Sequence, residues 1–302
     1  GMCAKNCPYN AIADLIRPCK KVCPVNAITM DENGICVIDE EKCIRCGKCI
    51  HSCPFGAIAS KTYIVPVIEA LKAGRHVYAM AAPATEGQFG ADITMASWKK
   101  AMKEMGFTDF YDVGLGGDMT AAYEAEEWAE AYKEGNKKVT SCCPAFVNMV
   151  RLHYPELAEC VSTTVSPMCA VSRLIKAKDP EAITVFIGPC VAKKSEVADQ
   201  KIEGNADYVL TYSEIRAMMK AKGVELQPCA NDDQTASTFG KRFANSGGVT
   251  AAVLESLKES NDEIAATVCK ANGAAECKKA LLLLKAARLP EDFIEGMACE
   301  GG

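Results

Sequence analysis

Several common functional signals are missing from this sequence. No apolar run reaches the ~18 residues that a membrane-spanning helix needs, and no secretory leader opens the chain. Basic residues form no run or stripe, and no glycine-rich phosphate-binding loop is present. Histidine is scarce, with 3 in 302 residues, and its positions suggest no metal ligand. We therefore expect a soluble, cytoplasmic protein with no membrane and no nucleic-acid partner.

Cysteine, in contrast, is abundant. The chain holds 18 cysteines, and half of them lie within the first 53 residues. Their gaps of two or three residues suit metal ligation, because cysteines that close rarely form unstrained disulfides. A secreted disulfide scaffold is the alternative, which the missing leader and the large second half of the chain disfavour. A chain of 302 residues also predicts two or three domains.

The first 60 residues carry the cysteine spacing of a two-cluster ferredoxin. The pattern C-x-x-C-x-x-C-x-x-x-C-P at 43–54 is typical of bacterial ferredoxins, in which three thiolates bind one [4Fe-4S] cluster and the fourth reaches another. A second stretch, C-x-x-x-C-P at 19–24, supplies a reciprocal ligand. One predicted cluster is bound by Cys43, Cys46, Cys49 and Cys23. The other would be bound by Cys53, Cys19, Cys3 and Cys7.

The other cysteines are interpreted differently. Cys3 and Cys7 resemble the end of a cysteine run whose front is missing, so we expect the chain to begin inside a motif. Cys36 lies in an alternating, strand-like stretch and is interpreted as a packed thiol. Five more have no ligand spacing and are interpreted as buried small residues, namely Cys160, Cys169, Cys229, Cys269 and Cys277.

After a linker at 60–62, strands and helices are predicted to alternate. The predicted helices are 64–71, 96–105, 120–132, 213–222, one opening at 246–249 and one after residue 277. The predicted strands are 76–81, 109–113, 138–141, 183–188 and 208–210. This alternation predicts an α/β domain with parallel sheets flanked by helices. We expect an α+β ferredoxin-like domain over 1–60 and an α/β domain over 61–302, with lobes of about 61–180 and 181–302.

Three cysteine motifs lie in this second domain, the first two at the ends of predicted strands. They read T-S-C-C-P at 140–144, G-P-C-V-A-K-K at 188–194 and E-G-M-A-C-E-G-G at 295–302. The adjacent cysteines of the first motif do not easily bind one metal together, so they suggest one ligand and one free thiol. Because ligands bind at the carboxyl edge of open α/β sheets, the motifs predict one metal site in a cleft between the lobes.

In this order, behind a ferredoxin-like segment, the three motifs resemble the signature set of [FeFe]-hydrogenases over essentially the whole chain. The resemblance implies an H-cluster, which is a [4Fe-4S] cubane joined through a cysteine sulfur to a two-iron unit carrying CO, cyanide and a bridging dithiolate. It implies that Cys143, Cys190 and Cys299 bind the cubane. The bridging cysteine of the family belongs just beyond Gly302, so we expect the H-cluster in the full-length parent protein.

The same resemblance implies roles for residues around the cluster. Cys142 matches a thiol that passes protons to the dithiolate amine, for which an ordinary thiol pKa of about 8.5 is suitable. Glu124 and Glu127, which share a helix face, and Ser162 match the rest of a proton relay. Lys193 matches a lysine that holds a cyanide ligand in a low-dielectric pocket. A packed cysteine, a solvated helix face and a surface lysine remain the alternatives.

Residues that line the pocket depart from the best-known catalytic members. The pocket proline, Pro83, is followed by Ala84 where a serine is common. Met168 stands in place of a glutamine, and Gly188 replaces a methionine before Pro189. These changes keep the ligands but alter their surroundings, which tune the metal. The resemblance is therefore to a divergent branch of the family.

The resemblance implies a ferredoxin-linked hydrogenase that catalyses 2H⁺ + 2e⁻ ⇌ H₂, with electrons relayed through the two N-terminal clusters. The implied partners are ferredoxin or a similar carrier, hydrogenase maturation proteins, H₂ and protons. A non-catalytic assembly factor and an H₂ or redox sensor remain alternatives. Retention of Cys142, Lys193 and the glutamate pair disfavours the assembly factor, because a simple cubane scaffold needs none of them.

Overall fold

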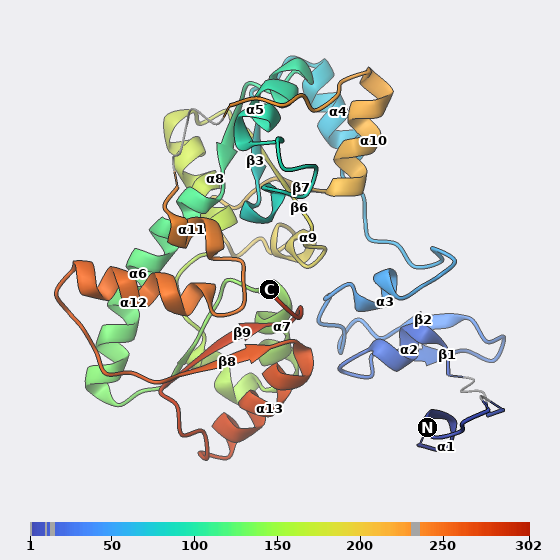
Figure 1. The fold of residues 1–302 in the computed structure, drawn as a ribbon, viewed down its shortest axis with the longest axis vertical. Coiled ribbons are helices and arrows are strands. Elements are labelled where there is room, and N and C mark those ends of the chain that lie inside the picture. Colours follow the sequence, from blue (N-terminus) through green and yellow to red (C-terminus); the bar gives the residue numbers. More distant parts are fainter. Residues whose placement is uncertain (1, 10, 13–15, 231–235) are drawn as a thin grey trace.

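The computed structural model describes residues 2–9, 11–12, 16–230 and 236–302 (Figure 1). The N-terminal part is a small α+β unit with an antiparallel pair of strands. Its elements are α1 (Met2–Lys5), α2 (Pro18–Val22), β1 (Ile28–Met30), β2 (Cys36–Ile38) and α3 (Lys48–His51). Within the described residues, no helix is both long and apolar enough to cross a membrane.

A four-stranded parallel sheet forms the first large layer, with strand order β4-β3-β6-β7. Its strands are β3 (Val77–Ala81), β4 (Asp109–Asp112), β6 (Ile183–Gly188) and β7 (Tyr208–Thr211). Successive residues of β3 belong to different hydrophobic clusters: Ala79 packs in the cluster of Trp98, and Met80 packs in the cluster of Met168. Both faces are therefore buried, as expected for a parallel sheet.

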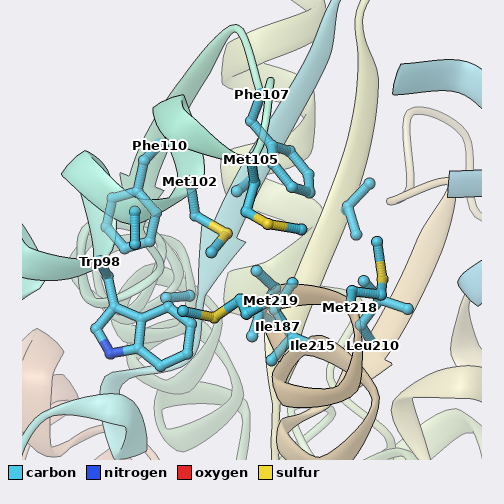
Figure 2. Close-up of a cluster of buried hydrophobic side chains, with 14 of the residues drawn as sticks. Trp98, Met102, Met105, Phe107, Phe110, Ile187, Leu210, Ile215, Met218 and Met219 are labelled. Carbon is cyan, nitrogen blue, oxygen red and sulfur yellow. The ribbon is translucent and has the colours of Figure 1, made fainter. Parts of the chain in front are cut away.

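Different helices cover the two faces of this sheet. One face packs against α4 (Ile64–Lys72), α5 (Met95–Glu104) and α10 (Tyr212–Lys222), and the other against α8 (Pro167–Lys178). Figure 2 shows the first cluster, where methionines fill the space between the aromatic rings of α5 and β4 and the aliphatic side chains of β6 and α10. Burial of these side chains stabilises the sheet by about 1.5–3 kcal/mol for each large residue.

A three-stranded parallel sheet forms the second layer, with strand order β5-β9-β8. Its strands are β5 (Lys138–Val139), β8 (Val268–Asn272) and β9 (Phe293–Met297). Every residue of the central strand β9 is buried, with Phe293 and Ile294 on opposite faces. The helices that cover them are α7 (Pro144–His153) and α13 (Ala274–Lys285) on one face, and α6 (Gly114–Glu134) and α12 (Gly248–Glu259) on the other.

The long helix α6 joins the two layers. It contacts α8, which covers the four-stranded sheet, and α12, which covers the three-stranded sheet. In Figure 1 it runs beside both sheets, while the C-terminus lies between them near α9 (Lys193–Glu196). The shorter elements are η1 (Pro83–Thr85), η2 (Pro155–Cys160) and α11 (Thr238–Arg242).

The α/β prediction is confirmed, and the strand predicted at 183–188 coincides with β6. The sheets, however, do not follow the expected lobes of 61–180 and 181–302. The four-stranded sheet combines β3 and β4 with β6 and β7, and the other sheet combines β5 with β8 and β9. Parallel neighbours are connected by crossovers, so order along the chain does not reveal which strands pair.

Candidate metal centre

The three predicted cubane ligands meet at the carboxyl edges of both sheets. Cys143 lies between β5 and the first residue of α7, Cys190 follows β6, and Cys299 follows β9. Burial raises the pKa of the Cys190 thiol to about 12, although the residue as a whole is half-buried. The neighbouring Cys143 and Cys299 raise this pKa further, while Lys193 opposes them. Cys143 also raises the pKa of Cys299, after burial.

This donor set fits an iron–sulfur cluster. Cys143 and Cys190 pack against a small apolar cluster made only of alanines, Ala145, Ala192 and Ala298. Thiolates are the ligands that such clusters require, and a bound cation would offset the cost of burying them. No three His, Cys, Asp or Glu side chains of the described residues form a single-ion site. In a cubane each cysteine binds a different iron atom, so its ligand sulfurs do not converge on one point.

A second group of predicted ligands lines a cavity of about 490 Å³ between the N-terminal unit and α9. All four cysteines assigned to the first cluster border it, namely Cys23, Cys43, Cys46 and Cys49. Burial raises the pKa of Cys46, and Cys23 and Cys43 add to the shift. Cys46 also packs against the same alanines as Cys143 and Cys190. The cavity therefore lies close to the three predicted cubane ligands.

The remaining predicted ligands are placed less uniformly. Cys19 is buried and lies beside Cys36, whose pKa is raised by burial and then by Cys19 and Cys53. The structure thus brings Cys36, interpreted from the sequence as a packed thiol, next to two predicted ligands. Cys3 is exposed and Cys7 is half-buried, and their assignment stays a prediction. Of the cysteines expected to be buried, Cys169 and Cys277 are, whereas the other three are half-buried, namely Cys160, Cys229 and Cys269.

A line of proton-carrying side chains begins at Cys142, next to the predicted ligand Cys143. Burial raises the pKa of the Cys142 thiol well above its ordinary value, and the charge of Glu124 raises it further. Glu124 is fully buried, which raises its pKa to about 8, with Glu127 one turn later contributing. The Ser162 hydroxyl donates a hydrogen bond to Oε2 of Glu127 at 2.6 Å. The predicted relay residues therefore lie together.

Glu124 has an unusual environment. Among the described residues, neither of its carboxylate oxygens has a hydrogen-bond partner of good geometry, although Trp128 and Ser162 lie close enough to lower its pKa slightly. A buried carboxyl without partners is costly when ionised and is kept mainly in its neutral form. Such strongly shifted groups are typical of functional sites.

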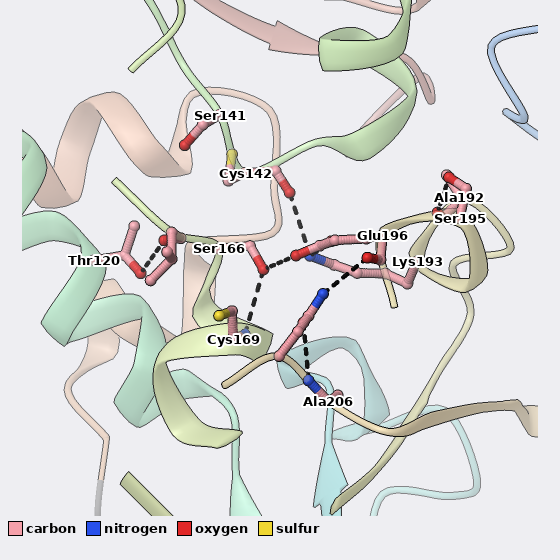
Figure 3. Close-up of polar contacts among 12 residues, drawn as sticks. Thr120, Ser141, Cys142, Ser166, Cys169, Ala192, Lys193, Ser195, Glu196 and Ala206 are labelled. Atoms are coloured by element: carbon pink, nitrogen blue, oxygen red, sulfur yellow. Dashed lines mark hydrogen bonds and ion pairs between the residues drawn. The ribbon is translucent and has the colours of Figure 1, made fainter. Parts of the chain in front are cut away.

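Lys193 lies on the other side of Cys142. Its Nζ donates to the Cys142 carbonyl at 3.4 Å and to Oε2 of Glu196 at 2.7 Å (Figure 3). The other oxygen of Glu196 accepts a hydrogen bond from the Ser166 hydroxyl. Burial would lower the pKa of Lys193, but Glu196 outweighs it and the net shift is upward. Lys193 is therefore a buried cation, and the surface-lysine alternative does not hold. Glu196 carries no role predicted from the sequence, although its K-x-x-E spacing from Lys193 can be read there.

The predicted pocket residues differ in their burial. Met168 is fully buried, Pro83 and Ala84 are half-buried where η1 begins, and Pro189 is exposed. A Cβ atom on Gly188 would lie 2.8 Å from the Phe186 ring and 2.9 Å from Ala82. A methionine at this position would therefore require the Phe186 ring and the chain at Ala82 to shift.

Strand β9, which precedes Cys299, also packs closely against its neighbours. A Cβ atom on Gly296 would lie 2.4 Å from the ring of Phe146, which is fully buried. Its neighbour Glu295 is buried as well. The Gly247 N–H donates a hydrogen bond to Oε1 of Glu295 at 2.6 Å, and the Thr250 N–H donates one to Oε2 at 2.9 Å. A carboxylate is stabilised at this position because it faces the positive end of the α12 dipole.

Two family models match parts of this chain. Residues 75–302 match the family model of the iron-only hydrogenase large subunit, C-terminal domain. Residues 7–64 match that of the LdpA Fe-S cluster-binding domain. A ferredoxin from Methanocaldococcus jannaschii is 49% identical over 47 residues. These matches support the predicted cofactors, namely [4Fe-4S] clusters and, in the parent protein, an H-cluster.

Curated relatives include several hydrogenases. The periplasmic [Fe] hydrogenase large subunit of Nitratidesulfovibrio vulgaris is 29% identical over 88% of this chain and 84% of its own length. Iron hydrogenase 1 of Clostridium pasteurianum is 28% identical over 88% and 63%. The NADP-reducing hydrogenase subunit HndD of Solidesulfovibrio fructosivorans is 27% identical over 72% and 43%. The chain thus spans less than two thirds of the last two relatives.

Solved structures agree on the fold. A structure of the apo [FeFe]-hydrogenase HydA1 from Chlamydomonas reinhardtii, in a variant form, superimposes with a TM-score of 0.60 at 20% identity. The match covers 77% of this chain and 81% of that one. The family model alone covers well over half of the chain, and the cysteines that carry the motif lie near one another. The chain belongs to the iron-only hydrogenase large-subunit family.

Proposed function

We propose that the parent protein is an iron hydrogenase that interconverts protons, electrons and H₂ at an H-cluster in the cleft. The observation that carries the proposal is the buried line from Cys142 through Glu124 and Ser162 to Glu127. A scaffold that only holds a cubane has no use for proton-carrying side chains beside it. This line therefore favours a catalyst over an assembly factor.

In this proposal Cys143, Cys190 and Cys299 bind the cubane. When bound, the H-cluster supplies the two-iron site at which H₂ is made or split. Cys142 exchanges a proton at its Sγ with Glu124, whose pKa of about 8 lets it hold and release a proton near neutral pH. Ser162 donates its own hydroxyl proton while it accepts another, and so connects Glu124 to Glu127.

Lys193 would orient an anionic ligand of the two-iron unit. Its ammonium is buried, and Glu196 and the Cys142 carbonyl hold it in place. An interaction between a cation and an anion is strengthened where water is excluded. The same ammonium keeps the cleft electrostatically favourable for the thiolates, because it opposes the rise in the Cys190 pKa.

Electrons would enter through the N-terminal clusters. The cavity lined by Cys46 lies next to the alanines that support Cys143 and Cys190, which makes it the natural step before the cleft. We propose ferredoxin or a similar carrier as the donor and maturation proteins as the source of the two-iron unit. We also propose a cytoplasmic location, although one relative is described as periplasmic.

An H₂ or redox sensor is the second candidate, and the altered pocket favours it. Gly188 and the buried Met168 change the packing beside the cleft while every ligand cysteine is kept. Such changes tune the potential and the reactivity of a metal site without removing it. Turnover separates the two candidates, since a sensor needs to bind H₂ but not to convert it rapidly.

Infrared spectroscopy on the full-length, matured parent tests the proposal. We expect bands of metal-bound CO and cyanide that shift under H₂, together with H₂ turnover from a reduced carrier. Shifting bands with very slow turnover would favour the sensor. Absence of the bands, with intact cubanes by electron paramagnetic resonance, would overturn the proposal and leave an electron-transfer or assembly protein.

A further inference from the structure

We propose that Lys138 is a positioning residue of the proton relay: its ammonium orients the Glu127 carboxylate towards Ser162 and keeps it ionised at the outer end of the line. No role was assigned to Lys138 by its sequence context, because its partner lies on another element, eleven residues earlier in the chain. The inference rests on the proposed function only where it concerns turnover. The pairing itself can be tested without turnover.

The geometry divides the two oxygens of Glu127 between two tasks. Lys138, on β5, donates to Oε1 at 2.7 Å, and Ser162 donates to Oε2 at 2.6 Å. The Thr163 N–H donates to both oxygens, at 3.2 and 3.1 Å, and the Thr164 hydroxyl to Oε2 at 3.4 Å. A carboxylate held on both sides has one orientation, in which Oε2 faces the relay hydroxyl.

The pair is shielded from water. The side chains of Lys138 and Glu127 are 20% and 15% exposed. The pair between Lys133 of α6 and Asp262 has a similar separation, 3.1 Å, but its side chains are 61% and 47% exposed. Exposed pairs contribute little, because water and salt screen them, whereas attraction grows as water is excluded. Lys133 is therefore a matched control on the same protein.

The surroundings of Glu124 and Glu127 shift the pKa values of these two glutamates in opposite directions. Burial alone would raise the pKa of Glu127, but the hydrogen bonds from Lys138, Ser162 and Thr163 outweigh it and lower the pKa. Burial and the Glu127 charge raise that of Glu124 to about 8. At neutral pH the inner carboxyl therefore holds a proton and the outer one does not, so a proton leaving Glu124 finds an empty acceptor.

The other charged neighbours do not change this direction. Cys160, at the end of η2, lies near Lys138, which opposes the burial-driven rise of its pKa, and Glu159 acts on the same thiol. Across the relay, Glu295 adds negative charge near Glu124. Of the groups described here, Lys138 is the cation that acts directly on Glu127, so its removal should raise the affinity of Glu127 for protons.

Turnover of the full-length, matured protein provides the first test, with H₂ oxidation measured against pH. Lys138→Met should shift the acid limb to higher pH and slow oxidation at pH 7 on the order of tenfold, less than the ~10²-fold or more that loss of a relay group itself costs. Lys138→Arg should restore the profile, and Lys133→Met should leave it unchanged. A superimposable Lys138→Met profile, or an arginine variant no better than methionine, would overturn the proposal.

Isotope-edited infrared titration of the full chain, with labelled glutamate, provides a second readout that needs no catalysis. The difference between the wild type and Glu127→Gln isolates the Glu127 carboxylate band. Lys138→Met, or Lys138→Gln if the methionine variant does not fold, should move the titration of this band to higher pH. An unmoved band overturns the proposal. A moved band in a protein without CO or cyanide bands would instead sink the proposed function while the Lys138 pairing stands.

Discussion

The two cysteine-rich regions of this molecule are built in opposite ways. In the N-terminal unit, three ligands of the first cluster lie within one short stretch, from Cys43 to Cys49, and line an open cavity. In the cleft, Cys143, Cys190 and Cys299 come from three strands of two sheets. A local site needs only a loop of the right length, whereas a distributed site needs the whole fold. The distributed site can also collect buried groups that a loop cannot shield.

Removal of one ligand from each region gives the largest expected effect. Cys190→Ser should abolish H₂ turnover with every electron donor, because the cubane loses a ligand in the cleft. Cys43→Ser should abolish only turnover that depends on ferredoxin, since a small reduced dye can deliver electrons nearer to the cleft. Turnover with both donors, together with the count of clusters by electron paramagnetic resonance, makes the comparison. Equal losses in both variants would show that the regions are not separable.

Within the cleft, the ligand and the free thiol should also differ. Cys142→Ala should slow turnover by about 10²- to 10⁴-fold, which is typical of a proton-transfer group, while the infrared bands of the cluster stay in place. The matched control is Cys169→Ala, because Cys169 is also buried but lies outside the relay. A Cys142 variant that turns over normally would remove this residue from the mechanism.

Local and distributed features also differ in how well the sequence predicts them. The spacing of Cys43, Cys46 and Cys49 and the apolar run of β6 are local. The three cysteines line one cavity, and β6 has the predicted bounds. Strand β9 was not predicted, because Glu295 and Gly296 interrupt its apolar pattern. Their reasons are tertiary: Glu295 caps α12, and Gly296 leaves room for the Phe146 ring.

The relay residues illustrate the same limit. The motif resemblance indicates Cys142, Ser162 and the two glutamates, whereas the sequence does not reveal Lys138. Lys138 meets Glu127 only because β5 passes beside α6. Pairing between side chains on different elements leaves no spacing in the chain, so it is visible only once the fold is known.

Stability should separate the regions as well. Phe146→Ala removes a fully buried ring that packs on the strand before Cys299, and this should lower the free energy of unfolding by about 3–5 kcal/mol. Phe55, in the N-terminal unit, is 89% exposed, and Phe55→Ala should change it by less than about 0.5 kcal/mol. Urea unfolding followed by circular dichroism measures both. Similar losses would contradict the packing described for Phe146.

The smallest expected effect is on how steeply the free energy of unfolding changes with pH. Glu124 has a pKa of about 8 in the folded chain and an ordinary, lower value when unfolded, so between these values only the folded state holds the proton. The free energy of unfolding should therefore fall as pH rises through this window, by at most about 1.4 kcal/mol per pH unit from this group. Glu124→Gln cannot ionise and should flatten the slope, whereas Glu126→Gln, on the exposed side of α6, should leave it unchanged. Equal slopes in the wild type and Glu124→Gln would mean that Glu124 is ionised in the folded protein at neutral pH. The inner and outer carboxyls of the relay would then carry the same charge, and the inferred difference in protonation between Glu124 and Glu127 would be lost.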